Sequence, residues 1–165
     1  MASISTPREL FLHELGDILF VERKLADEVL PKLIGEVQDD ELRKGLEKHL
    51  DETRQHATNV EGVFDSLGEK PEAEKCLGFE GLTKEHDELL GETSGELVDL
   101  VDTGAAARTE HYEIAAYEGL ISMARSLEER EAVGLLEENL KEEKEALREV
   151  ESAAKRLTKE QAKVA

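Results

Sequence analysis

Residues 7–36 read PRELFLHELGDILFVERKLADEVLPKLIGE, and this stretch decides the fold because its apolar residues recur at every third or fourth position. Ser5 and Thr6 stand just before it as candidate N-caps, so we predict that a helix begins here. Pro31 predicts a kink in the last turns. The inward stripe carries one carboxylate among apolar residues: Phe11, Leu15, Ile18, Glu22, Leu25, Val29 and Leu33. The first prediction is therefore a long helix with a buried glutamate.

Three more long segments have the same helical spacing, and they cover residues 39–68, 96–128 and 130–157. A shorter one at 79–90 follows the loop EKPEAEKCLG and precedes the break GETSG. Because short turns join the first long segment to the second and the third to the fourth, these helices should pack as antiparallel hairpins. We predict an all-α chain with a single domain. Its antiparallel four-helix bundle covers about 7–157, with an extra short helix between the second and third long helices and a frayed C-terminal tail.

The composition argues against several classes of function. The chain has 40 acidic and 21 basic residues, and a formal net charge of −19 would repel nucleic acid and anionic membranes. Such an excess of acid is also found in halophilic proteins. No stretch approaches the roughly 20 apolar residues of a membrane span, and the opening MASISTPRELF lacks the pattern of a signal peptide. Cys76 lies in a polar loop and is expected to be a surface thiol. We predict a soluble, cytoplasmic protein.

A faint internal repeat relates the two halves of the chain. LEKHLDETRQH at 46–56 aligns with LEENLKEEKEA at 136–146, and FVERKL aligns with HYEIAA. The two alignments pair four glutamates: Glu52 with Glu142, and Glu22 with Glu113. Two similar hairpins related by an approximate two-fold axis would bring these four acids to one level of the bundle.

Polar residues interrupt the apolar stripe of every long helix. Besides Glu22, the candidates are His49, Glu52 and His56 on the second helix, Glu110 and Glu113 on the third, and Glu142 or Glu143 on the fourth. Two carboxylates 4 Å apart repel by about 4 kcal/mol at an effective dielectric constant of about 20. A cluster of this kind takes up protons or binds cations. The mixture of oxygen and nitrogen donors predicts a site for two metal ions in the centre of the bundle.

Each of these residues, taken alone, also has an ordinary explanation. A glutamate in a helix stripe, such as Glu22, often pairs with Lys or Arg or turns outward to water. His49 and His56 can be hydrogen-bonded histidines of the core, and the acids of the last two helices can be half-exposed. Agreement among all four helices is what favours the metal site. Motifs for other chemistry do not occur: the chain has no Gly-rich phosphate loop, no CxxC pair and no HExxH motif.

Three segments are similar to the helices of a known family. ELFLHELGDILFVERKLADEVLPKL, HLDETRQHATNVEGVF and EHYEIAAYEGL resemble the corresponding helices of the YciE/YciF-type family of ferritin-like proteins linked to stress. The resemblance extends over about residues 7–157. It implies a ferritin-like bundle with an added helix, which agrees with the stretch at 79–90. It also implies homodimers rather than storage cages.

The same resemblance implies a ligand set for two iron ions. Glu22 and Glu113 would be terminal ligands, Glu52 and Glu142 would bridge the two metals, and His56 would supply nitrogen.

This sequence departs from the wider ferritin-like pattern, which has Glu-x-x-His on the second and fourth helices. Here His56 follows Glu52 by four positions, and Ala146 stands where the fourth helix would carry its histidine. The site is therefore poor in nitrogen and would hold one metal weakly. Three other residues are placed to fill the gap: Glu110, His49 and Glu143.

The leading hypothesis is a dimetal carboxylate protein that binds iron and reacts with dioxygen or peroxide, as a ferroxidase or peroxidase-like oxidoreductase in oxidative or osmotic stress. Two alternatives stay open. A manganese pair would give catalase-like chemistry. A non-enzymatic scaffold or interaction dimer would have its buried acids protonated or salt-bridged. The metal content of the purified protein separates these three hypotheses.

Overall fold

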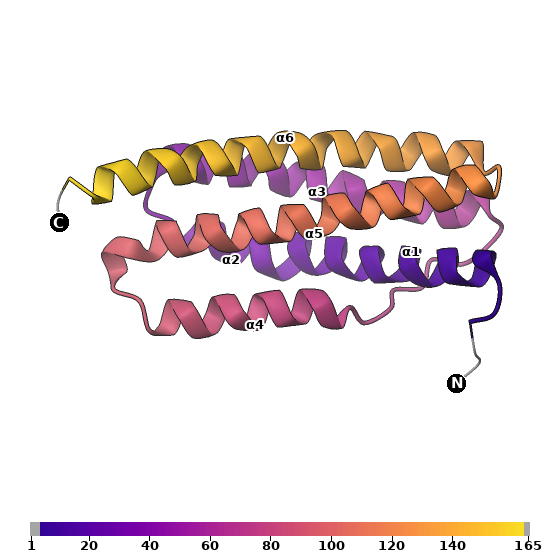
Figure 1. Cartoon of the computed structure of the whole chain (residues 1–165), viewed down its shortest axis with the longest axis horizontal. Coiled ribbons are helices and arrows are strands. Elements are labelled where there is room, and N and C mark those ends of the chain that lie inside the picture. The colour runs from indigo at the N-terminus through magenta and orange to yellow at the C-terminus, as the bar shows by residue number, and fades with distance from the viewer. Residues whose placement is uncertain (1–3, 164–165) are drawn as a thin grey trace.

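The computed structural model describes residues 4–163, and every regular element in that range is helical. Four long helical segments lie side by side, with a shorter helix along one flank (Figure 1). In chain order the elements are α1 (Pro7–Lys24), η1 (Leu25–Val29), α2 (Leu30–Glu36), α3 (Asp40–Ser66), α4 (Leu77–Gly91), η2 (Gly95–Leu97), α5 (Val98–Ser126) and α6 (Arg130–Gln161). The prediction of an all-α chain is confirmed; that the chain forms one domain stays a prediction.

The long helices enclose one apolar core. α3 packs against α1 and α6, and α5 packs against the same two helices from the other side. α1 and α3 run in opposite directions, as do α5 and α6 (Figure 1). α4 lies along α5 and leads the chain from the end of the molecule where α3 finishes to the end where α5 begins (Figure 1). α3 and α5 therefore run in the same direction. The core between them is mostly Leu, Val and Ile, as expected for a chain with 4% aromatic residues.

Local chemistry explains where the first helix begins and where its regular geometry fails. Thr6 accepts a hydrogen bond from the Glu9 N–H at 3.2 Å, and the Glu9 carboxylate accepts one from the Thr6 N–H at 2.9 Å, which closes a capping box. Pro31 has no N–H and its ring crowds the carbonyl four residues earlier. The chain widens into the π-helical turn η1 just before this proline, with the Leu30 N–H donating to the Leu25 carbonyl. The predicted irregularity is thus a π turn, and it begins three residues after Glu22.

The extra helix predicted at 79–90 is α4, and it begins two residues earlier than expected. Cys76 caps it: the sulfur accepts a hydrogen bond from the Phe79 N–H at 3.4 Å. The prediction of a surface thiol is wrong, because Cys76 is 1% exposed and its Sγ lies 2.9 Å from the Tyr112 hydroxyl. The loop folds back over α1 and α5, which no periodic pattern could indicate.

Two further findings concern the ends of the chain and membranes. α6 continues to Gln161, beyond the predicted boundary at 157, and the last two residues of the predicted frayed tail lie outside the described residues. Over the range 4–163, no helix is both long enough and apolar enough to cross a membrane.

The loop between α3 and α4 rests on α1 at Gly16. The Glu74 N–H donates to the Gly16 carbonyl at 2.9 Å, and a Cβ added to Gly16 would lie 2.8 Å from the Glu72 backbone oxygen. Only a residue without a side chain allows this approach. The loop is therefore held close to the helix by a backbone contact.

We expect Gly16→Ala to lower the free energy of unfolding by about 1–3 kcal/mol, because the new methyl group forces the loop away from α1. Gly119→Ala is the matched control: Gly119 lies within α5 with nothing within 4 Å of the added carbon. There the change should stabilise the protein by about 0.5–1 kcal/mol. Urea unfolding of both variants checks the expectation, and equal effects of the two substitutions would contradict it.

Candidate metal centre

Six polar side chains from all four long helices meet inside the bundle, each between 0 and 6% exposed. We call them the acid–histidine cluster: Glu22 of α1, His49 and His56 of α3, Glu110 and Glu113 of α5, and Glu143 of α6. Helical spacing explains the convergence, since residues three, four or seven apart on one helix share a face. The cluster contains four carboxyl groups and two imidazoles.

Glu143 links the cluster into one unit. Its Oε1 lies 2.8 Å from His56 Nδ1, and its Oε2 lies 3.7 Å from His49 Nε2. One ligand atom each from Glu22, His56 and Glu143 lie within 4.8 Å of one another, and the same holds for His49, Glu110 and Glu143. Glu143 therefore belongs to both trios and presents one carboxylate oxygen to each histidine.

Most of the inward-facing atoms of the cluster make no hydrogen bond of ordinary geometry, although His56 Nδ1 and Glu143 Oε1 lie 2.8 Å apart and form a close ion pair when the imidazole is protonated. Among residues 4–163, nine buried side-chain nitrogen or oxygen atoms are unpartnered, and eight belong to the cluster. The eight are Glu22 Oε2, His49 Nδ1, His56 Nδ1, Glu110 Oε2, both oxygens of Glu113 and both oxygens of Glu143. Each such atom costs about 1–3 kcal/mol when it is buried without a partner. A folded chain with this many unpartnered atoms at one place has the donors of a cation site.

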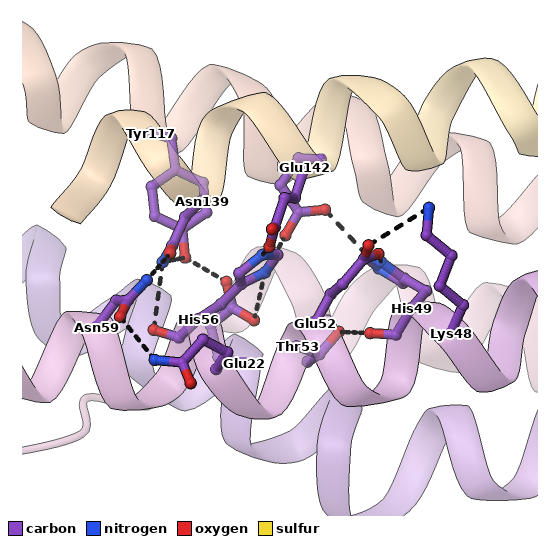
Figure 2. A network of polar contacts seen from close by, with 12 residues as sticks. Glu22, Lys48, His49, Glu52, Thr53, His56, Asn59, Tyr117, Asn139 and Glu142 are labelled. Atoms are coloured by element: carbon purple, nitrogen blue, oxygen red, sulfur yellow. Dashed lines mark hydrogen bonds and ion pairs between the residues drawn. The ribbon is translucent and has the colours of Figure 1, made fainter. Parts of the chain in front are cut away.

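Residues that do not belong to the cluster orient two of its members by hydrogen bonds (Figure 2). The Tyr117 hydroxyl donates to Glu22 Oε1 and in turn accepts a hydrogen bond from Asn139 Nδ2 at 3.0 Å. Asn59 Nδ2 donates to Asn139 Oδ1 at 2.7 Å, which ties α3 to α6. On His56, Nε2 lies 2.8 Å from Glu142 Oε2. Glu22 and His56 each have one atom held from outside while the other, Oε2 or Nδ1, faces the cluster.

Two of the predicted ligands, Glu52 and Glu142, lie at the edge of the cluster and are partly exposed to solvent. The Glu52 side chain is 19% exposed and contacts Lys48 at 3.3 Å, and the Glu142 side chain is 31% exposed. Thr53 and Glu143, the next residue on each helix, occupy the inward positions. The structure thus does not bring Glu22, Glu52, Glu113 and Glu142 together as the four central acids, since Glu143 stands where Glu142 was expected.

The inward residues explain how the Glu-x-x-His pattern is altered. α3 carries Thr53-x-x-His56, and α6 carries Glu143-x-x-Ala146, so each helix retains one half of the pattern. Thr53 is satisfied by its own helix, because its hydroxyl donates to the His49 carbonyl at 2.8 Å. His49, two turns before His56, brings the second imidazole into the cluster.

The sequence did not predict the hydrogen bonds that join Asn59, Asn139 and Tyr117 beside the cluster. Asn139 occupies the position equivalent to His49 when residues 136–146 are aligned with 46–56, and a polar residue at such a position on an apolar stripe was the available signal. Its partners could not be found, because hydrogen bonds between helices depend on how the helices are rotated against each other.

The surroundings shift the pKa values of the cluster toward proton uptake. Burial raises the pKa of Glu22 and that of Glu113, which the neighbouring acids raise further. Burial raises the pKa of Glu143 to about 7, although His56 acts in the opposite direction. Burial disfavours the charged form of His56, but Glu143 and Glu22 outweigh it and raise the pKa of this histidine to about 11. Without metal the cluster therefore holds extra protons, which a bound cation would displace.

These shifts predict how the stability of the metal-free protein depends on pH. Glu143 titrates at an ordinary pKa of 4.5 in the unfolded chain and at about 7 in the folded one, so between these values the folded state binds more protons and stability falls as pH rises. His56 acts with the same sign at higher pH, from 6.5 upward. We expect the free energy of unfolding in chelator to fall between about pH 5 and pH 8. Glu143→Gln should reduce this fall by about 3 kcal/mol. Urea unfolding across this range checks it, and stability that rises with pH would contradict it.

Comparison with known proteins reveals clear relatives. Residues 6–163 match the family model described as a domain of unknown function, DUF892. Protein YciF of Escherichia coli strain K12 is 34% identical over 144 residues, which is 86% of each chain. The crystal structure of this YciF, described as a stress protein, matches with a TM-score of 0.88 and 32% identity over 94% of this chain and 99% of that one.

Two other solved structures are similar. YcfI of Rhodopseudomonas palustris, described as a candidate structural protein, has a TM-score of 0.87 and 37% identity over 90% of this chain and 95% of its own. A Xanthomonas campestris protein has a TM-score of 0.73 and 21% identity over 93% of this chain and 94% of its own, a likeness in fold alone.

Proposed function

The chain belongs to the DUF892 family and is similar to the stress protein YciF, and we propose that its acid–histidine cluster binds a pair of iron ions inside a ferritin-like four-helix bundle. The observation that carries the proposal is Glu143, whose two oxygens face two different histidines and belong to both trios of ligand atoms. A carboxylate in that position can bridge two cations.

The donor set fits iron. One metal would be held by Glu22, His56 and Glu143, and the other by His49, Glu110 and Glu143. Glu113 supplies the fourth carboxylate, with two buried oxygens that have no other partner. Imidazole nitrogen favours iron and zinc, and carboxylate oxygen favours magnesium and manganese, so a mixed set of four carboxylates and two imidazoles suits iron, with manganese as the alternative.

The chain's own residues would prepare this site. When bound, a ferrous pair supplies two electrons, enough to reduce dioxygen to hydrogen peroxide with two protons. Tyr117 holds Glu22 Oε1 and leaves Oε2 for the metal. Glu142 contacts His56 Nε2 at 2.8 Å and reaches the surface, so it is placed to orient the imidazole and to pass protons between water and the interior.

The description of one relative supports a biological role. YciF of E. coli is described as a stress protein, and we propose that this chain handles iron with dioxygen or peroxide under oxidative or osmotic stress. We further propose a cytoplasmic homodimer. Sedimentation should then give twice the 18.4 kDa of one chain.

Iron oxidation tests the activity directly. Metal-free protein mixed with ferrous iron in air should take up two iron ions per chain and form ferric product, followed by near-ultraviolet absorbance, faster than iron alone. His56→Ala should remove the acceleration. As the control, His13→Ala changes an exposed histidine of α1 and should retain the acceleration. Oxidation by the His56→Ala protein at the rate of the unaltered chain would overturn the proposal.

A scaffold is the second candidate function. Two imidazoles and four carboxyl groups can neutralise one another through shared protons, and the R. palustris relative is described as a candidate structural protein. In that case protein purified without chelator contains almost no metal, and Glu143→Gln folds and assembles as the unaltered chain does. Metal analysis therefore separates the scaffold from the iron protein, and the same analysis distinguishes manganese from iron.

A further inference from the structure

A line of polar contacts runs from the surface of α3 and α6 to the interior of the bundle. His49 Nε2 lies 3.2 Å from Glu110 Oε1 inside the cluster, and His49 Nδ1 lies 3.5 Å from Glu52 Oε2 at the edge. The other oxygen of Glu52, Oε1, lies 3.3 Å from Lys48 Nζ, and the same ammonium lies 3.1 Å from Glu149 Oε1. Figure 2 shows the middle part of this line, from Lys48 through Glu52 to His49.

Exposure to solvent increases steadily along the line. The side chains of Glu110 and His49 are 4% and 8% exposed, that of Glu52 is 19% exposed, and those of Lys48 and Glu149 are about half exposed. A partly open pocket beside the line reaches the same depth. Its lining includes Lys48 and Glu149 at the surface and His49 and Glu110 at the bottom. This face of α3 and α6 therefore connects solvent with the second proposed iron position.

Lys48 is the cation in this line of acids. Its ammonium contacts two carboxylates from different helices, those of Glu52 and Glu149. A divalent metal ion has twice the charge of an ammonium and binds carboxylate oxygens directly, so the two cations compete for the same pair of acids. Ion pairs as exposed as these are weak and change an equilibrium by no more than roughly fivefold. An arriving metal ion can therefore displace the lysine.

His49 provides a donor that can take over a cation from the edge. It is 6% exposed, and its Nδ1 makes no hydrogen bond of ordinary geometry although it lies beside Glu52. A cation on Glu52 would therefore meet a buried nitrogen donor on its inner side. Because the other nitrogen of the same imidazole lies next to Glu110, the ring connects the edge with the interior position.

We propose that ferrous iron enters the cluster along this line, and that Lys48 is a latch that closes the entrance until the metal ion displaces it. This inference rests on the proposed function, because it concerns the way into the iron site. It assigns Glu52 to the uptake of the metal and not to the final set of ligands, which agrees with its position at the edge. Because a net charge of −19 already attracts cations to the surface, the step at Lys48 limits the rate of uptake.

Stopped-flow mixing of metal-free protein with cobalt(II) tests the latch. Cobalt accepts the same oxygen and nitrogen donors, and its visible absorbance gives both the rate of uptake and the amount bound at saturation. Lys48→Gln should take up cobalt about 2–5-fold faster than the unaltered chain and bind the same amount. Lys48→Arg keeps the positive charge and should keep the slow rate. Lys44→Gln is the matched control, since it removes the same charge one turn earlier on α3 and should leave the rate almost unchanged.

A second pair of variants tests the role of Glu52. Glu52→Gln removes the carboxylate that passes the cation to His49, and it should slow uptake roughly tenfold without changing the amount bound at saturation. Glu47→Gln makes the same change at an exposed position of α3 and should retain the rate of the unaltered chain. Equal amounts of cobalt at saturation also show that the variants are folded.

Equal rates for Lys48→Gln and Lys44→Gln would overturn the latch, even if both proteins bind two cobalt ions and so retain the proposed metal site. If Glu52→Gln binds less cobalt at saturation with an unchanged rate, Glu52 is a ligand and the route is wrong. An unaltered chain that binds no cobalt would overturn the metal site itself and the route with it. The rate and the amount therefore separate failure of this inference from failure of the proposed function.

Discussion

A Glu143→Gln protein is expected to bind at most one iron ion per chain, where the unaltered chain binds two. Glu143 is the residue whose ligand oxygens belong to both trios of the cluster, so the change weakens both positions together. The amide is similar in size but has no charge to offset two cations. Loss of a ligand should lower the affinity for the metal pair at least about 100-fold, since even supporting residues around a metal contribute roughly 10–100-fold. Anaerobic titration with ferrous iron, followed by metal analysis of the desalted protein, measures the stoichiometry.

Glu142→Gln is the matched control for this experiment. It makes the same chemical change at the preceding residue of α6, where the side chain is 31% exposed and lies 2.8 Å from the outward nitrogen of His56. It should retain both iron ions with an affinity reduced by about tenfold, the lower end of the range for supporting residues, because the side chain is partly exposed. If Glu142→Gln loses the pair while Glu143→Gln keeps it, then Glu142 is the bridge, as the family resemblance alone implies.

Metal loading is expected to raise the melting temperature of the unaltered chain by on the order of 10–20 °C. A ligand that binds only the folded state at 100 times its dissociation constant stabilises by about 2.7 kcal/mol per site, hence about 5 kcal/mol for two sites. For a chain of this length each kcal/mol shifts the midpoint by about 2–4 °C. The physical origin is the cluster itself, whose eight unpartnered atoms and mutually repelling acids gain cationic partners. Scanning calorimetry under nitrogen, with ferrous iron or manganese, measures the shift.

The control must separate specific binding from screening of the surface, because a net charge of −19 makes any divalent cation somewhat stabilising. Calcium at the same concentration reports that general effect, since it prefers six to eight oxygen ligands and should not enter a site with two imidazoles. We expect calcium to raise the midpoint by only a few degrees. Shifts of the same size with calcium and iron would contradict specific binding in the core.

Much of the fold was predictable because helical periodicity is repeated over many turns. Residues 39–68 and 130–157 show it without a break, and they correspond to α3 and α6. The buried positions of Glu22, Glu110 and Glu113 follow from the same pattern, since each interrupts an apolar stripe.

The register within a stripe was harder to predict. Neighbouring residues on a helix are separated by only about 100°, so periodicity could not choose between Glu142 and Glu143. The choice depends on how α6 is rotated against α3 and α5, which is a property of the packed bundle. For the same reason Thr53 rather than Glu52 faces inward on α3.

Features that depend on irregular backbone escaped the sequence. The loop that buries Cys76 against Tyr112 follows no period, and its position depends on the backbone contact at Gly16. A partly open pocket beside His49 is likewise lined by small residues of different helices and by the π turn that begins three residues after Glu22. None of these has a local signature in the amino-acid sequence.

Anomalous diffraction at the iron absorption edge, from crystals grown with ferrous iron, tests the dimetal centre most directly. Two peaks should lie inside the bundle, one between Glu22 and His56 and the other between His49 and Glu110, with Glu143 in contact with both. An interior without anomalous signal, or iron found only among the surface carboxylates, would contradict the centre and leave a helical scaffold whose buried acids are neutralised by protons.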